Sequence, residues 1–102
     1  MIMTKQDIFL PNTLIEPSLR IIGWHLENYI PSLEIDILLK RIKDKIERHK
    51  RNNGIVLLEQ KELYPLWECV SNATNNVSEC GLDEETVWAI YEWVISEQKK
   101  QQ

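Results

Sequence analysis

The most regular pattern of hydrophobic and polar positions lies at the C-terminal end of the chain, from Gly81 to Gln102. At about 100° per residue, one side of a helix in this segment is apolar and the opposite side is polar or small. The apolar side carries Val87, Ile90, Tyr91, Val94 and Ile95. Asp83 is a favourable N-cap residue, and Gly81 can take the left-handed conformation that ends a preceding helix. Beyond Ile95 the apolar side continues with Gln98 and Gln102, so the pattern predicts an amphipathic helix whose buried side becomes polar near its end.

Helical spacing of apolar residues also covers most of the first half of the chain. It runs from Ile15 to Leu33, but Pro31 interrupts it and the apolar side changes phase there. Two alternatives stay open, namely two helices that meet near Pro31 or one long helix that kinks. A further helix is predicted over residues 33–53, and its apolar side ends in the polar residues His49 and Asn53, with Lys50 on the flank. Residues 1–12 are expected to be a short helical or irregular lead-in.

A third long helix is predicted to end at Cys80 and to begin either near Glu59 or at Pro65. Its apolar side carries Leu66, Cys69, Val70, Ala73, Val77 and Cys80. Residues 55–58 form a short apolar linker before it, and few glycines or alternating stretches occur anywhere. The sequence therefore predicts an all-α fold, a small bundle of three to four helices that forms a single domain over residues 1–102.

The polar ends of these helices are predicted to converge. In an up-and-down bundle, the helix over 33–53 and the last helix end at the same end of the molecule, where the third long helix begins. The residues brought there are His49, Lys50, Asn53, Glu59, Glu62, Gln98 and Gln102. This arrangement predicts a small polar site lined by a cation, carboxylates and amides. The alternative for the last turn is that its amides fray into solvent.

Composition narrows the class of protein. The 102 residues include 12 basic and 16 acidic ones, for a net charge of −4, which argues against a nucleic-acid-binding protein. No apolar run is long enough to span a membrane, and the first residues lack the features of a signal peptide, so a cytoplasmic protein is expected.

The sequence offers no disulfide, metal site or catalytic motif. On one helix Cys69 and Cys80 would lie about 16 Å apart, which is too far for a disulfide. No metal-ligand spacing and no catalytic motif occurs.

Basic residues concentrate between Lys40 and Arg51, where seven of the twelve lie. One interpretation is a solvated helix face supported by ion pairs with Asp44 and Glu47. The other is a cationic patch for an anionic ligand.

Two segments resemble the all-helical chorismate mutases. They are Val87–Gln102, preceded by Gly81-Leu-Asp, and Lys50-Arg-Asn-Asn-Gly54-Ile-Val. The resemblance implies a three-helix chain that forms a homodimer through long first helices, with two active sites shared between subunits. It also implies an isomerase that converts chorismate, a small dianionic substrate, to prephenate without a cofactor or a metal.

The resemblance assigns roles to individual residues. Lys50 matches a lysine that contacts the substrate's carboxylate and ether oxygen, and Gln102 matches a glutamine that donates to that oxygen. Gln98 falls at a carboxylate-binding position, and Glu59 falls where an aspartate commonly begins the second helix. Arg20 resembles an early arginine that reaches the partner's site.

Two positions of the family align with this sequence only after a deletion or a shift. The family's Arg-Glu pair corresponds to Lys61-Glu62 with one residue deleted, which makes Glu62 a catalytic candidate. A gapless alignment places Leu39 at the family's mid-helix arginine, and Arg41 serves as a substrate-binding residue after a shift of two positions.

Two functions are therefore carried forward. The first is a chorismate mutase-type isomerase, or a relative that acts on a similar dicarboxylate such as isochorismate. The second is a small helical protein-binding module of the immunity or inhibitor type, without catalysis. Its surface would contain Trp24, Trp93 or the basic segment 40–51, because both tryptophans lie off the apolar sides of their predicted helices.

Overall fold

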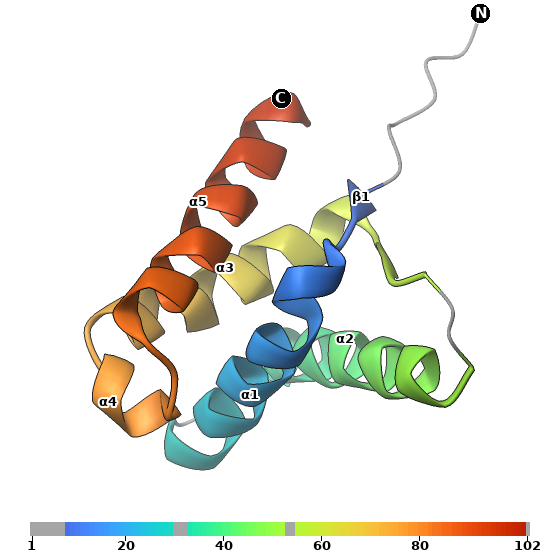
Figure 1. Ribbon diagram of the computed structural model, residues 1–102. Coiled ribbons are helices and arrows are strands. Elements are labelled where there is room, and N and C mark those ends of the chain that lie inside the picture. The colour runs from blue at the N-terminus through green and yellow to red at the C-terminus, as the bar shows by residue number, and fades with distance from the viewer. Residues whose placement is uncertain (1–7, 30–32, 53–54, 102) are drawn as a thin grey trace, which may run out of the picture.

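The computed structural model describes residues 8–29, 33–52 and 55–101, with the backbone alone at 33 and 50–52 (Figure 1). Over these residues the chain forms five α-helices and one pair of two-residue strands. In chain order they are β1 (Ile8–Phe9), α1 (Asn12–Asn28), α2 (Leu33–Asn52), β2 (Leu57–Leu58), α3 (Gln60–Thr74), α4 (Val77–Cys80) and α5 (Glu84–Lys100). The predicted all-α fold is confirmed. None of the helices in these ranges is both long and apolar enough to cross a bilayer.

The first half of the chain forms two separate helices. Helix α1 ends at Asn28, because Tyr29 is extended (φ −117°, ψ 146°), and α2 begins at Leu33. The two axes cross at a wide angle in Figure 1 instead of continuing one another. Of the two alternatives near Pro31, the structure has two helices; Pro31 itself lies outside the described residues. The single long first helix implied by the resemblance is thus divided between α1 and α2.

A small β-ribbon joins the segment that was expected to be a helical or irregular lead-in to the segment that was expected to be a short apolar linker. Strands β1 and β2 are antiparallel, with Ile8 opposite Leu58 and Phe9 opposite Leu57. The amide of Leu10 donates to the carbonyl of Val56 at 3.1 Å and extends the pairing by one bond. The inner side of this ribbon belongs to the hydrophobic core and consists of Ile8, Leu10, Val56 and Leu58.

Helix α3 begins at Gln60 and contains Pro65, which confirms the earlier of its two possible starts. It ends at Thr74, and residues 77–80 form the separate helix α4, so one helix to Cys80 was wrong. The amide of Asn76 donates to the carbonyl of Ala73 at 3.0 Å, which closes a turn between the two helices. The run of Ser, Thr and Asn from residue 71 to 76 explains the break, because these side chains compete for backbone hydrogen bonds.

Helix α5 follows its prediction closely. Gly81 has φ 71° and ends α4, and Asp83 precedes α5 in extended conformation. Val87, Ile90 and Val94 are fully buried and Tyr91 packs against the same core, while the opposite side of the helix is exposed. Its last turn differs in detail, because the buried polar residue is Glu97, whose carboxylate pairs with Lys100 at 2.9 Å, and Gln98 is only half-buried.

Trp24 and Trp93 were expected to be exposed, but both are at least partly buried. Trp24 is 9% exposed and belongs to the core, and Trp93 is partly buried against it. The prediction of two exposed tryptophans was therefore wrong. Trp24 lies off the main apolar side of α1 but packs against the ring of Tyr29, the residue that follows this helix, with the ring centroids 5.3 Å apart.

Candidate functional site

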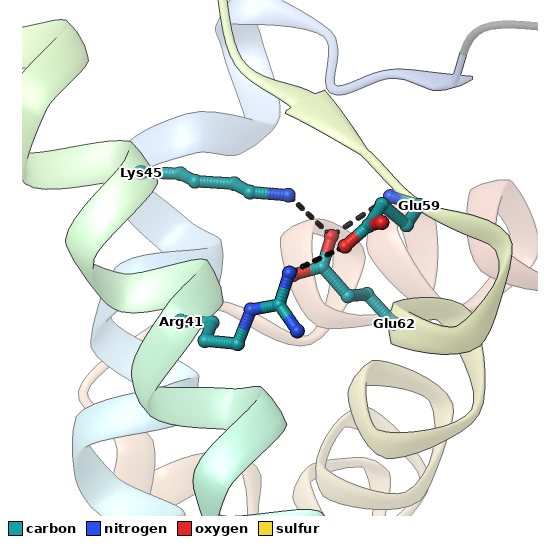
Figure 2. A network of polar contacts seen from close by, with 4 residues as sticks. All are labelled: Arg41, Lys45, Glu59 and Glu62. Atoms are coloured by element: carbon teal, nitrogen blue, oxygen red, sulfur yellow. Dashed lines mark hydrogen bonds and ion pairs between the residues drawn. The ribbon is translucent and has the colours of Figure 1, made fainter.

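Four charged side chains meet between the middle of α2 and the start of α3 (Figure 2). Arg41 Nη2 lies 2.6 Å from Glu59 Oε2, and Lys45 Nζ lies 2.6 Å from Glu62 Oε1. Arg41 and Lys45 are four residues apart and share one side of α2. Glu59 is the N-cap residue of α3, and Glu62 lies in the first turn of that helix. We call these four residues the charged cluster.

Glu62 is held by the helix start as well as by the lysine. Its Oε1 also accepts a hydrogen bond from the backbone N–H of Glu59 at 2.8 Å. This is the carboxylate half of a capping box, which satisfies a backbone donor that the first turn of a helix leaves open. Glu62 is 0% exposed, and its Oε2 has no hydrogen-bond partner among the described residues.

The charged cluster contains two cations and two carboxylates, so its net charge is zero. One of its two ion pairs is more deeply buried than the other. Lys45 is 22% exposed beside the fully buried Glu62, whereas Arg41 and Glu59 are both close to half exposed. A buried carboxylate is costly unless a cation and hydrogen bonds compensate it, so Lys45 is needed by Glu62 itself. The arrangement can anchor α2 to α3, but neither cation is free to bind a dianionic ligand.

The structure brings together three of the residues that were predicted for the site, namely Arg41, Glu59 and Glu62. Lys45 was missed, although its spacing of four from Arg41 on one helix side was the signal that could have found it. The side chain of Lys50 and the whole of Gln102 lie outside the described residues.

The predicted convergence of three helix ends is present only in part: the end of α5 meets the start of α3, whereas the end of α2 lies well away from the end of α5 in Figure 1. Gln60 Nε2 donates to the carbonyl of Gln101 at 3.5 Å, so the end of α5 lies beside the start of α3. Gln98 is half-buried one turn earlier on α5.

Arg20 lies elsewhere in the chain. It is exposed on α1, and its Nη1 would be 3.1 Å from a Cβ at Gly81, next to the start of α5. It lines a cavity of about 380 Å³ with Glu16, Pro17, Leu19 and Leu82. Within one chain, therefore, Arg20 and the charged cluster lie at opposite ends of α5.

A second polar group, which the sequence reasoning missed, surrounds His25 near the end of α1. The imidazole is 7% exposed and stacks on the ring of Tyr29 at 4.7 Å, with an interplanar angle of 10°. Burial lowers the pKa of His25, while the charges of Glu68 on α3 and Asp36 on α2 act in the opposite direction. The Nδ1 of His25 and the Oε2 of Glu68 are buried without a hydrogen-bond partner among the described residues.

Acid is expected to destabilise the fold through His25. Because its pKa is lowered in the folded state, the unfolded chain binds more protons, so the stabilisation is complete above the ordinary value of 6.5 and is lost as the pH falls through it. His25→Phe keeps the stacked ring but removes the titration. Urea unfolding from about pH 7.5 to 5 should give a steeper loss of unfolding free energy for the natural protein than for His25→Phe. Equal slopes for the two proteins would contradict this role of His25.

The two thiols offer no reactive group. Burial raises the pKa of the fully buried Cys69, and it also raises that of Cys80. The thiolate is the nucleophile and the metal ligand, so both cysteines are chemically quiet in the folded protein. Across the described ranges, no group of His, Cys, Asp and Glu side chains is placed to hold a metal ion.

Among the described residues, large exposed apolar side chains gather in two places, and Trp88 on α5 is exposed by itself. Phe9, Ile55 and Leu57 lie on the outer side of the β-ribbon, opposite its core side. Ile37 on α2 and Tyr64 on α3 are 51% and 54% exposed and line a common groove of about 430 Å³. Exposed apolar residues that gather in this way are typical of interaction surfaces.

No known protein family, no curated protein and no solved structure matches this chain. The resemblance to chorismate mutases, mainly over residues 50–102 and strongest over 81–102, stays a prediction.

Proposed function

We propose that this protein is a small helical protein-binding module, the second of the two functions suggested by the sequence. Its binding surface is the outer side of the β-ribbon, formed by Phe9, Ile55 and Leu57, and not the tryptophans or the basic segment 40–51. The observation that carries the proposal is that these three large apolar side chains are exposed together, at 51%, 72% and 45%.

The backbone of the β-ribbon supports the same function. The sheet has the order β1-β2, so within the described residues each strand has one edge without a partner. Residues 8–10 and 55–58 contain no charged side chain and no proline, the features with which proteins commonly protect open edges. An extended, uncharged segment of a partner protein fits this surface, because it can add a strand at an edge and place apolar side chains against Phe9 and Leu57.

The basic segment on α2 is a weaker candidate for the binding surface than the β-ribbon. Its side chains Lys40, Arg41, Lys43 and Lys45 pair with Asp36, Glu59, Glu47 and Glu62, respectively. These carboxylates offset the charge of four of the segment's seven basic residues, so the segment is less cationic than its composition suggests and the apolar ribbon is the better surface.

Selection from a displayed library of random linear peptides tests the proposal. The full-length protein should enrich extended, uncharged sequences rich in β-branched and aromatic residues. Their affinity should fall about 10–100-fold in the double variant Phe9→Ser/Leu57→Ser, because apolar anchors dominate such contacts. Trp88→Ser, at an exposed position on α5, is the matched control and should bind normally. Failure to enrich any peptide, or equal binding by the double variant, would overturn the proposal.

The isomerase is retained as a second candidate because the end of α5 meets the start of α3, as its active site requires. It also requires cations that are free to hold a dicarboxylate and donors directed at the ether oxygen. In this proposal Lys50 and Gln102 supply the donors and Gln98 a carboxylate contact, while Arg20 arrives from a second subunit.

A further inference from the structure

The pairing of the two strands determines which backbone groups of the β-ribbon point outward. The amide of Leu10 donates to the carbonyl of Val56, and the adjacent residues Phe9 and Leu57 lie opposite one another. In an antiparallel ribbon, pairs of residues that exchange hydrogen bonds alternate with pairs that do not. Leu10 and Val56 are therefore a hydrogen-bonded pair, and Phe9 and Leu57 are not. The N–H and C=O groups of Phe9 and Leu57 consequently point to the two open edges of the ribbon.

The edge of β1 offers few backbone groups to a partner. Groups that point to the same edge of a strand belong to every second residue. Two residues after Phe9 comes Pro11, which has no N–H and whose carbonyl accepts from the amide of Leu14 at 2.9 Å. Two residues before Phe9 the chain lies outside the described residues. In the described part of β1 and its continuation, the edge therefore offers the N–H and C=O of Phe9 alone.

The edge of β2 offers twice as many groups. Ile55 lies two residues before Leu57, so its N–H and C=O point to the same edge. Among residues 8–29, 33–52 and 55–101, none forms a hydrogen bond with these four groups. The row ends at Glu59, whose N–H and carbonyl are both engaged with Glu62, at 2.8 and 2.9 Å. The side chains of Ile55 and Leu57 are 72% and 45% exposed on the outer side of the ribbon, beside this edge.

We propose that a segment of the partner protein adds to the edge of β2 as a third, antiparallel strand, which exchanges two backbone hydrogen bonds with Ile55 and two with Leu57. Antiparallel pairing is favoured because it is more stable per residue than parallel pairing. Two partner residues, spaced by two, then lie directly opposite Ile55 and Leu57 and place apolar side chains against them. This inference rests on the proposed function and adds to it the edge, the direction and the register of the partner.

N-methylation of a peptide backbone tests the added strand. The probe is the tightest-binding peptide of the library selection, made with one N-methyl group at each position in turn. Two positions, spaced by two residues, should each lose at least about tenfold in affinity, because their N–H groups donate to the carbonyls of Ile55 and Leu57. The position between them should lose less than about threefold, because its N–H points away from β2. Isothermal titration calorimetry measures these affinities.

An alanine scan of the same peptide tests the direction of the strand. In antiparallel pairing, the residues that donate to Ile55 and Leu57 also lie directly opposite them. Alanine should therefore weaken binding most at the two positions that are sensitive to N-methylation. In parallel pairing the sensitive side chains lie between the donating N–H groups, so an interleaved result would overturn the proposal.

Single substitutions on the protein test the choice of edge. Ile55→Ser should weaken binding of the unmethylated peptide by about tenfold or more, because Ile55 is next to the added strand. Phe9→Ser should weaken it by less than about threefold, because β1 lies two strand spacings, about 10 Å, from the added strand. Both side chains are exposed, at 72% and 51%, so neither change should disturb the fold, which urea unfolding checks.

Failure of this inference can be told from failure of the proposed function. If the library yields no peptide, the proposed function fails and this inference fails with it. If peptides bind but tolerate N-methylation at every position, or if Phe9→Ser weakens binding more than Ile55→Ser, the strand at the edge of β2 is overturned and the proposed function stands.

Discussion

Replacement of Lys45 by methionine is expected to lower the free energy of unfolding by about 2–4 kcal/mol. The change keeps the apolar stem but leaves the carboxylate of Glu62 buried without its cation, and Glu62 is 0% exposed. Removal of one partner from a buried ion pair costs more than the pair contributes, because the remaining charge loses its compensation. The side chain of Lys45 is 22% exposed, so the expected loss of unfolding free energy is smaller than for a fully buried ion pair.

Two controls separate this effect from a general loss of surface charge. Lys43→Met breaks the exposed pair with Glu47, whose atoms are 3.7 Å apart, and should change the unfolding free energy by no more than about 0.5 kcal/mol. Adding Glu62→Gln to Lys45→Met should recover part of the loss, because the amide oxygen can still accept from the Glu59 amide. Urea unfolding measures all of these proteins. A loss from Lys45→Met no larger than that from Lys43→Met would contradict the role assigned to the charged cluster.

Truncation of Ile90 to alanine is expected to cost about 3–4 kcal/mol, a large share of the stability of a domain of this size. Ile90 is 0% exposed in the middle of the buried side of α5, so its removal leaves a cavity in the core that neighbouring side chains fill only partly. The midpoint of thermal unfolding should fall by roughly 12–32 °C.

Ile95→Ala is the matched comparison on the same helix. Ile95 is only half-buried, so its truncation should cost about 1 kcal/mol. Similar losses for the two variants would show that α5 does not pack through the side that contains Ile90.

The helices were the predictable part of this fold. Val87, Ile90 and Val94 recur at helical spacing, and local signals at Gly81 and Asp83 mark where α5 begins, so no distant contact is needed to predict it. The β-ribbon was not predictable in this way. Phe9 and Leu57 pair across 48 positions of sequence, and strands of two residues are too short to show an alternating pattern.

The candidate site was predicted in part. Glu59 and Glu62 follow from the start of a helix, and Arg41 from the concentration of basic residues on α2. The preference of Glu62 for Lys45 depends on the angle between α2 and α3, which no local pattern contains. The same holds for His25, whose surroundings come from Asp36 and Glu68 on two other helices.

We propose that the charged cluster is structural and that the protein acts by binding another protein. The most direct test is the rate at which the purified, full-length protein converts chorismate in the absence of metal and cofactor. We expect no acceleration over the buffer rate for the natural protein, for Lys50→Ala or for the surface control Lys43→Ala. Rapid conversion by the natural protein and Lys43→Ala that is abolished in Lys50→Ala would contradict this proposal and establish the isomerase instead.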